Sequence, residues 1–87
     1  MRLTIIPIDK SIIIDNIGFN NIDDDFSWIP SDVHAVQWYD TWGEIEYNNN
    51  NPNTKINQLG IYKQAVDIFN NESKKVTEQV KRLAKGI

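Results

Sequence analysis

The sequence of 87 residues contains no cysteine, and it has one histidine and only four glycines. Without cysteine there are no disulfides and no thiolate ligands for a structural metal site. His34 stands alone in an alternating segment, so we interpret it as a hydrogen-bonded structural residue rather than a catalytic one. The glycines, at positions 18, 43, 60 and 86, are too scattered to form a phosphate-binding loop. We therefore expect no enzyme and no cofactor.

Long hydrophobic runs are also missing. No apolar stretch is long enough to span a bilayer, and Pro7 and Asp9 interrupt the first apolar run before a secretory signal core could form. The three consecutive acids Asp23, Asp24 and Asp25 lack the alternate ligand spacing, central glycine and distal glutamate of a calcium loop. The sequence therefore predicts neither a membrane partner nor a metal site.

Charge is present but unevenly distributed. Residues 1–50 hold nine acidic and two basic side chains, a formal charge of -7, whereas residues 51–87 hold three acidic and seven basic ones, a charge of +4. A chain with this polarity could pack end against end, or could present its basic end to an acidic partner. Ordinary solvated faces are the alternative explanation.

The most strongly patterned stretch is 34–47, HAVQWYDTWGEIEY. Two alternating runs flank a turn that contains Asp40 and Gly43, which predicts a β-hairpin. Pairing Trp38 with Ile45 and Val36 with Tyr47 leaves Thr41-Trp42 as the tip. These four apolar residues then share one face, because residues of a strand alternate between faces. Trp42 becomes an exposed aromatic residue at the tip.

A second hairpin is predicted from the β-branched runs 2–8 and 11–17, which are separated by Asp9-Lys10. Leu3, Ile5 and Ile8 would share a face with Ile12 and Ile14. Ile13, on the opposite face, would need separate cover from a helix. Residues 16–32 are rich in Asn, Asp and Gly, so we expect a loop there, held over the sheet by Phe26, Trp28 and Ile29.

The pattern changes to that of a helix near the C-terminus. Residues 57–85 are predicted to form one helix that Asn57 could cap. Its apolar face recurs at alternating spacings of four and three, and consists of Tyr62, Val66, Phe69, Ser73, Val76, Val80, Leu83 and Ile87. A helix of about 37 Å is longer than strands of about 20 Å can cover. We expect its first half to lie on the sheet and its second half either to contact another protein or to fray.

These predictions describe one α+β domain over residues 1–87. Residues 1–50 would form a small antiparallel sheet of two hairpins, about four strands, packed against one long C-terminal helix over 57–85. The distal half of that helix is the predicted element for oligomerisation or partner binding.

Several segments resemble a class of small bacteriophage proteins. The segments are IPSDVHAVQW at 29–38, GEIEY at 43–47, Pro52-Asn53 and INQL at 56–59, preceded by Ile8-Asp9, Ile14-Asp15 and Gly18. They are similar to tail-associated proteins and tail-fibre assembly chaperones, over about residues 3–60. The resemblance implies a non-catalytic structural or assembly role, in the virion or in the cytoplasm of an infected bacterium.

Two function classes follow. The first is an interaction protein that associates with itself or with a phage tail component, through the predicted contact residues Trp42, Val76, Val80 and Leu83. The alternative is nucleic-acid binding through the basic helix end, with the residues Lys74, Lys75, Lys81, Arg82 and Lys85. The acidic first half and a pI near 4.9 disfavour the second class.

Overall fold

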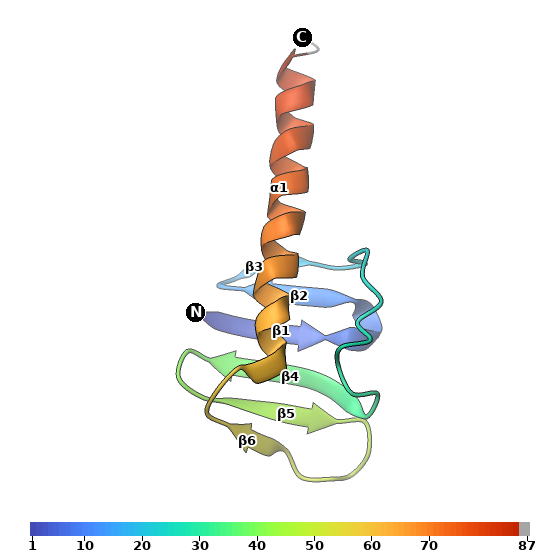
Figure 1. Ribbon diagram of the computed structural model, residues 1–87, viewed down its shortest axis with the longest axis vertical. Helices are drawn as coiled ribbons and strands as arrows, with labels where there is room; N and C mark the ends of the chain where they lie inside the picture. Colours follow the sequence, from blue (N-terminus) through green and yellow to red (C-terminus); the bar gives the residue numbers. More distant parts are fainter. Residues whose placement is uncertain (86–87) are drawn as a thin grey trace.

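The computed structural model describes the backbone of residues 1–85 and the side chains of residues 1–80. One antiparallel sheet of six strands has the order β3-β2-β1-β4-β5-β6, and one α-helix crosses it (Figure 1). The class is α+β, but the prediction of about four strands is wrong. The strands are β1 (Arg2–Ile6), β2 (Ser11–Ile14), β3 (Ile17–Phe19), β4 (Val33–Tyr39), β5 (Gly43–Tyr47) and β6 (Thr54–Ile56).

The two strands that the sequence did not reveal are the edges of the sheet. β3 and β6 have three residues each, too few for an alternating pattern to emerge. β3 pairs with β2 through a two-residue turn, Asp15-Asn16, in which both residues have positive φ (48° and 73°). Tight hairpin turns of the I′ type need this geometry, and Asp and Asn adopt it more readily than most residues. Both edges form because a longer strand beside them offers free hydrogen-bonding groups.

The first predicted hairpin is present, but it is shorter than expected. β1 ends at Ile6 because Pro7 starts a 3₁₀ turn, η1 (Pro7–Asp9), which closes with Lys10 in the left-handed region at φ 49°. The register pairs Leu3 with Ile14 and Ile5 with Ile12, so these four residues share a face as predicted. Ile8 lies outside the strand and is 83% exposed, so its assignment to that face is wrong.

The central hairpin is also present, but its register differs from the prediction. Trp38 lies opposite Gly43 and Val36 opposite Ile45, so the tip is Asp40-Thr41, and the Tyr39 amide donates to the Trp42 carbonyl at 2.7 Å. A Cβ on residue 43 would lie 2.9 Å from the Trp38 ring, so glycine fits there. Asp40, the first tip residue, has φ 80°. A shift of two residues keeps every side chain on its face, and the predicted apolar grouping therefore survives.

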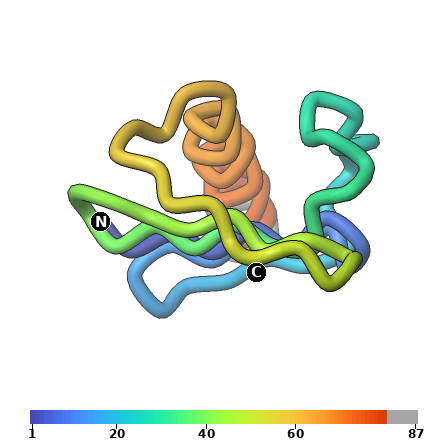
Figure 2. Tube along the Cα trace, turned by 90° about the horizontal axis from the view of Figure 1, so that it is seen from below, coloured from blue at the N-terminus to red at the C-terminus, as the bar shows by residue number. Residues whose placement is uncertain are grey.

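The core lies on one face of the sheet only. Its four fully buried large side chains are Leu3, Ile5, Ile12 and Val36. Figure 2 shows the helix and the loop of residues 20–32 on the same side of the sheet, with no element covering the other side except the β2–β3 turn at its margin. In that loop Ile22, Phe26 and Ile29 are buried. We call the second side the uncovered face. Ile13 lies on it, so the expectation that a helix covers Ile13 is wrong.

The helix begins later than predicted. A 3₁₀ turn, η2 (Gly60–Lys63), leads into α1 (Gln64–Lys85), so Asn57 does not cap the helix. Gly60 has a positive φ of 56°, which breaks a regular helical path at that point. With 22 residues, α1 is about 33 Å long. It crosses the strands and continues well past β3, the last strand on that side (Figure 1).

Candidate functional site: the projecting half of the helix

The helix has two halves with the same apolar spacing and different surroundings. Ala65 is fully buried in the core cluster, and Phe69 packs its ring edge-on against Phe19 of β3 at 5.1 Å between centroids. About two and three turns beyond Phe69, Val76 and Val80 are 49% and 60% exposed. Residues 65, 69, 76 and 80 lie on one side of a helix with 3.6 residues per turn. The stripe that contacts the sheet therefore continues into solvent.

We call Val76 and Val80 the distal stripe. Both were predicted contact residues, and the structure places them side by side on the part of α1 that projects beyond the sheet. Leu83, the third predicted contact residue of the helix, has a side chain that lies outside the described residues. Its backbone is helical, and its spacing of three from Val80 continues the same stripe in the sequence.

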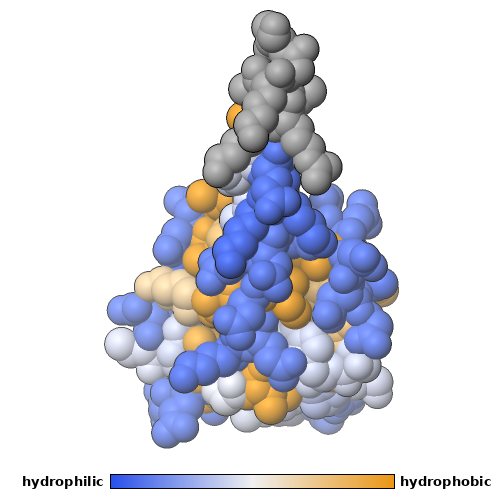
Figure 3. Space-filling model, turned by 45° about the horizontal axis from the view of Figure 1, so that its top comes forward, coloured by the Kyte–Doolittle hydropathy of each residue, from blue (hydrophilic) through white to orange (hydrophobic). Residues whose placement is uncertain are grey.

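Most charged residues described in this half of α1 lie away from the stripe, although Glu72, four residues before Val76, lies on its side of the helix and pairs with Lys75. Lys74 and Glu78 point away from the stripe, whereas Thr77 and Gln79, which flank it, are uncharged. Figure 3 shows the outer side of the helix as a band of hydrophilic side chains. An apolar stripe on one side of a helix, with charged residues on the other, can pack against another helix.

A groove lies beside α1 where the loop of residues 20–32 approaches it. Its volume is about 320 Å³, and its lining consists of Asp23, Asp24, Ile68, Asn71, Glu72, Lys74, Lys75 and Glu78. Within it, Lys75 Nζ lies 3.0 Å from Glu72 Oε1. Asp24 holds the loop, because its Oδ2 accepts hydrogen bonds from the Phe26 amide at 2.8 Å and the Trp28 indole at 3.0 Å. Four carboxylates against two lysines make this groove acidic.

Trp42, the predicted contact residue of the hairpin, occupies a different place from the one expected. It is not at the tip, and it is 37% exposed. Its ring lies 4.7 Å from that of Tyr39 and 5.3 Å from Lys55 Nζ, while the Arg2 guanidinium lies 4.6 Å from the Tyr39 ring. Arg2 and Tyr39 pair next to the buried pair Leu3 and Trp38, so they point to the uncovered face. We call these four side chains, Arg2, Tyr39, Trp42 and Lys55, the aromatic row.

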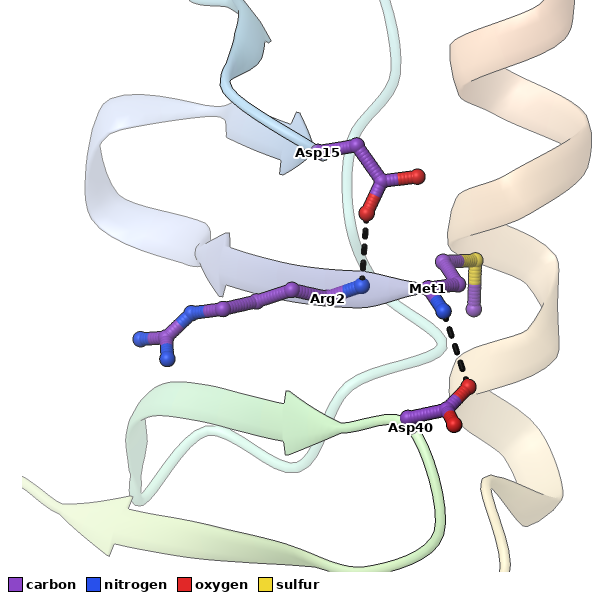
Figure 4. Close-up of polar contacts among 4 residues, drawn as sticks. All are labelled: Met1, Arg2, Asp15 and Asp40. Atoms are coloured by element: carbon purple, nitrogen blue, oxygen red, sulfur yellow. Dashed lines mark hydrogen bonds and ion pairs between the residues drawn. The ribbon is translucent and has the colours of Figure 1, made fainter.

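The start of the chain is fixed beside this row. The Met1 ammonium donates to Asp40 Oδ1 at 2.8 Å, and the Arg2 amide donates to Asp15 Oδ1 at 2.8 Å (Figure 4). The hydrogen bond from Met1 lowers the pKa of Asp40 below its ordinary value, and the same bond raises the pKa of the Met1 amino group. Both positive-φ turns, at Asp15 and Asp40, are thus tied to the first strand.

The other residues considered from the sequence lie apart from the distal stripe. His34 is exposed on β4. The Asp25 carboxylate accepts a hydrogen bond from the Ser27 amide at 2.9 Å, which lowers its pKa. Among residues 1–85, no group of three or more His, Cys, Asp or Glu side chains is placed to hold a metal ion. In the same part of the chain, no helix combines the length and the apolar character needed to cross a bilayer.

Sequence reasoning missed two features of this region. The acidic groove depends on contact between the loop of residues 20–32 and α1, which begins more than thirty residues after the loop ends, and no local pattern predicts such a contact. The aromatic row depends on the register of β4, β5 and β6. The resemblance to phage tail-associated proteins remains a prediction. No family model matches the chain, and neither the curated proteins nor the solved structures compared with it contain a match.

Proposed function

We propose that this chain is a non-catalytic phage tail-associated structural or assembly protein that acts through protein–protein interaction, in the virion or in the cytoplasm of an infected bacterium. The observation that carries the interaction role is the distal stripe. Val76 and Val80 are half exposed or more on a helix that extends past the sheet. The tail-associated setting rests on the sequence resemblance.

The second half of α1 leaves apolar surface exposed to water that a partner could bury. Fully burying a valine side chain stabilises a complex by about 1.5–3 kcal/mol relative to leaving it in water. The sheet already covers the first half of α1, whereas no other described residue buries the stripe of the second half, which is therefore free to pack against a partner. An amphipathic helix that lays its apolar side against a partner is a common mode of recognition.

The alternative, nucleic-acid binding, receives less support from the geometry. Lys74 and Lys75 line the same groove as Asp23, Asp24, Glu72 and Glu78. A phosphate backbone that approached the two lysines would also meet four carboxylates, and the repulsion would offset most of the attraction. We therefore retain the protein-interaction role.

A chain that ends at Asn71 tests the proposal, because it removes the distal stripe and no fully buried side chain of the described residues. We expect it to keep the β-sheet signal in far-ultraviolet circular dichroism and a cooperative thermal transition. We expect it to lose association, both with itself and with phage tail proteins, in sedimentation velocity runs. Association that survives the truncation would contradict the proposal, as would a full-length chain that binds neither itself nor any of those proteins.

A further inference from the structure

The surroundings of the distal stripe restrict what can cover it. We infer that the stripe pairs with the same stripe of a second copy of this chain, with the two helices antiparallel and overlapping only in their projecting halves. The inference rests on the proposed function and names its partner. It follows from three features of the described residues: the position of the sheet, the uncharged flanks of the stripe and the acidic groove.

The position of the sheet determines whether the second helix can pack parallel or antiparallel to α1. The sheet lies on the same side of α1 as the stripe, because Ala65 and Phe69 contact it and share that side with Val76 and Val80. A parallel helix on the stripe would place its own first half where β1, β2 and β3 already lie. In an antiparallel pair, the first half of the second helix extends beyond the C-terminal end of α1. The sheet of the second copy therefore lies beyond that end, where it does not overlap the first sheet. Only the antiparallel arrangement leaves room for both sheets, and it closes as a two-fold dimer.

The flanks permit two copies of the same helix to pair. Antiparallel pairing centred between the two valines sets Val76 of one copy against Val80 of the other. Thr77 and Gln79 then border the contact, and neither carries a charge, so no like charges meet there. The charged residues Lys74 and Glu78 point away from the two valines, toward the rim of the groove.

Charge complementarity favours a second copy over an unrelated helix. The same pairing sets residue 85 of one helix beside residue 71 of the other, next to the groove lined by Asp23 and Asp24. In the sequence, the last turns of α1 carry three basic residues and no acidic one, namely Lys81, Arg82 and Lys85. Each basic end thus approaches the acidic groove of the other copy, which matches the opposite charges of the two halves of the chain.

The first experiment measures the solution mass of the full chain by light scattering on a size-exclusion column, from micromolar to millimolar concentration. We expect twice the monomer mass of 10.1 kDa at high concentration. Val76→Asp/Val80→Asp should remain monomeric with an unchanged helical signal. The matched control Gln64→Glu/Asn70→Asp changes the charge by the same amount at two exposed residues of α1 that line neither the stripe nor the groove, and should still dimerise.

A second measurement tests the direction of pairing. Because the chain has no cysteine, Lys63→Cys introduces a single site for a nitroxide label at an exposed position just before α1. In the antiparallel dimer the two labels are separated by 30 residues along the axis, about 45 Å. In a parallel pair they are separated mainly by the distance between helix axes, about 10 Å plus the label arms. Electron–electron double resonance separates these two values.

Each outcome has a clear meaning. A dimer with the long label distance that is lost in Val76→Asp/Val80→Asp supports the inference. A short distance, or a dimer that persists in that variant, overturns it. A full chain that stays at 10.1 kDa throughout also overturns it. If the full chain is monomeric but binds a tail protein, and Val76→Asp/Val80→Asp abolishes that binding, the proposed function is retained and only the dimer is rejected. If the chain binds no protein at all, both the dimer and the proposed function are rejected.

Discussion

The two halves of α1 carry one apolar pattern but have different surroundings. Around Ala65 and Phe69 the stripe meets a sheet and is removed from water, whereas around Val76 and Val80 the same stripe projects into solvent. The spacing of apolar residues therefore predicts the helix and the side of it that will be buried, but not the partner that buries it. In the first half the partner is the chain's own sheet, whereas in the second half none of the other described residues buries the stripe.

The strongest test of this difference between the two halves of α1 is to introduce one carboxylate into each half. Ala65→Asp would bury a carboxylate in the core, where Ala65 is 0% exposed, and we expect a loss of about 3 kcal/mol or more, a large part of the stability of a small domain. Val76→Asp places the carboxylate in water, and we expect a change within about 0.5 kcal/mol. Urea unfolding of the two variants at a concentration where the chain is monomeric gives both values.

Equal effects of the two substitutions would contradict the comparison. A severe loss at Val76 would mean that the second half of α1 is covered within a single chain, whereas a mild loss at Ala65 would mean that the first half does not pack on the sheet. Ala65→Ser serves as the control, because it changes the same buried position without adding a charge and should cost far less than Ala65→Asp.

The same contrast explains which parts of the fold could be predicted from the sequence. Leu3, Ile5, Ile12 and Ile14 share their predicted face because alternation along a strand is a local property. The pairing of Trp38 could not be derived in this way. Shifting the register by two leaves the burial pattern unchanged, and the contact between the Trp38 ring and Gly43 that accompanies the observed pairing is visible only in three dimensions.

The sequence carries a weak signal for β3, one of the two edge strands that the alternating pattern does not reveal. Asp15-Asn16 lies between Ile14 and Ile17, and a pair of residues that tolerates positive φ between two β-branched residues is typical of a tight hairpin. β6 had no such signal, because three residues with a polar flank differ little from a loop. Of the candidate site, the stripe could be predicted from spacing alone, whereas the groove and the aromatic row require the tertiary arrangement.

The aromatic row offers a second, smaller test, since the uncovered face of the sheet is the other bare surface of the molecule. Trp42→Ala removes a ring that stacks on Tyr39 at 4.7 Å and lies under Lys55. We expect a loss of about 1 kcal/mol in chemical unfolding, while Trp42→Phe should keep most of the stacking. If only the distal stripe mediates self-association, the solution mass of Trp42→Ala should equal that of the unsubstituted chain. A monomeric Trp42→Ala would transfer the interaction role to the sheet.

The smallest expected effect lies at one margin of the sheet, in the ion pair between Met1 and Asp40. The lowered pKa of the Asp40 carboxyl means that its contribution to stability is present above its ordinary value of 3.8 and is lost as the pH falls through its pKa in the folded chain. The raised pKa of the Met1 amino group means that its contribution is present below 8.0 and is lost as the pH rises through its folded value. The gain from the pair is therefore confined to about pH 4–8.

Asp40→Asn isolates this gain, because asparagine tolerates the positive φ of residue 40 as well as aspartate does. The difference in melting temperature between the unsubstituted chain and this variant should be largest near pH 6 and should shrink at both extremes. Acetylation of the Met1 amino group removes its charge at every pH, so it should abolish the gain from the pair across the whole range. Asp9→Asn is the control, because Asp9 is an exposed carboxylate without an ion pair among the described residues. Its melting temperature should differ from that of the unsubstituted chain by an amount that does not vary in this way with pH. A difference in melting temperature that does not vary with pH would mean that Asp40 acts through the conformation of the turn and not through its charge. The solution mass of each of these variants should equal that of the unsubstituted chain, because the ion pair lies far from the distal stripe.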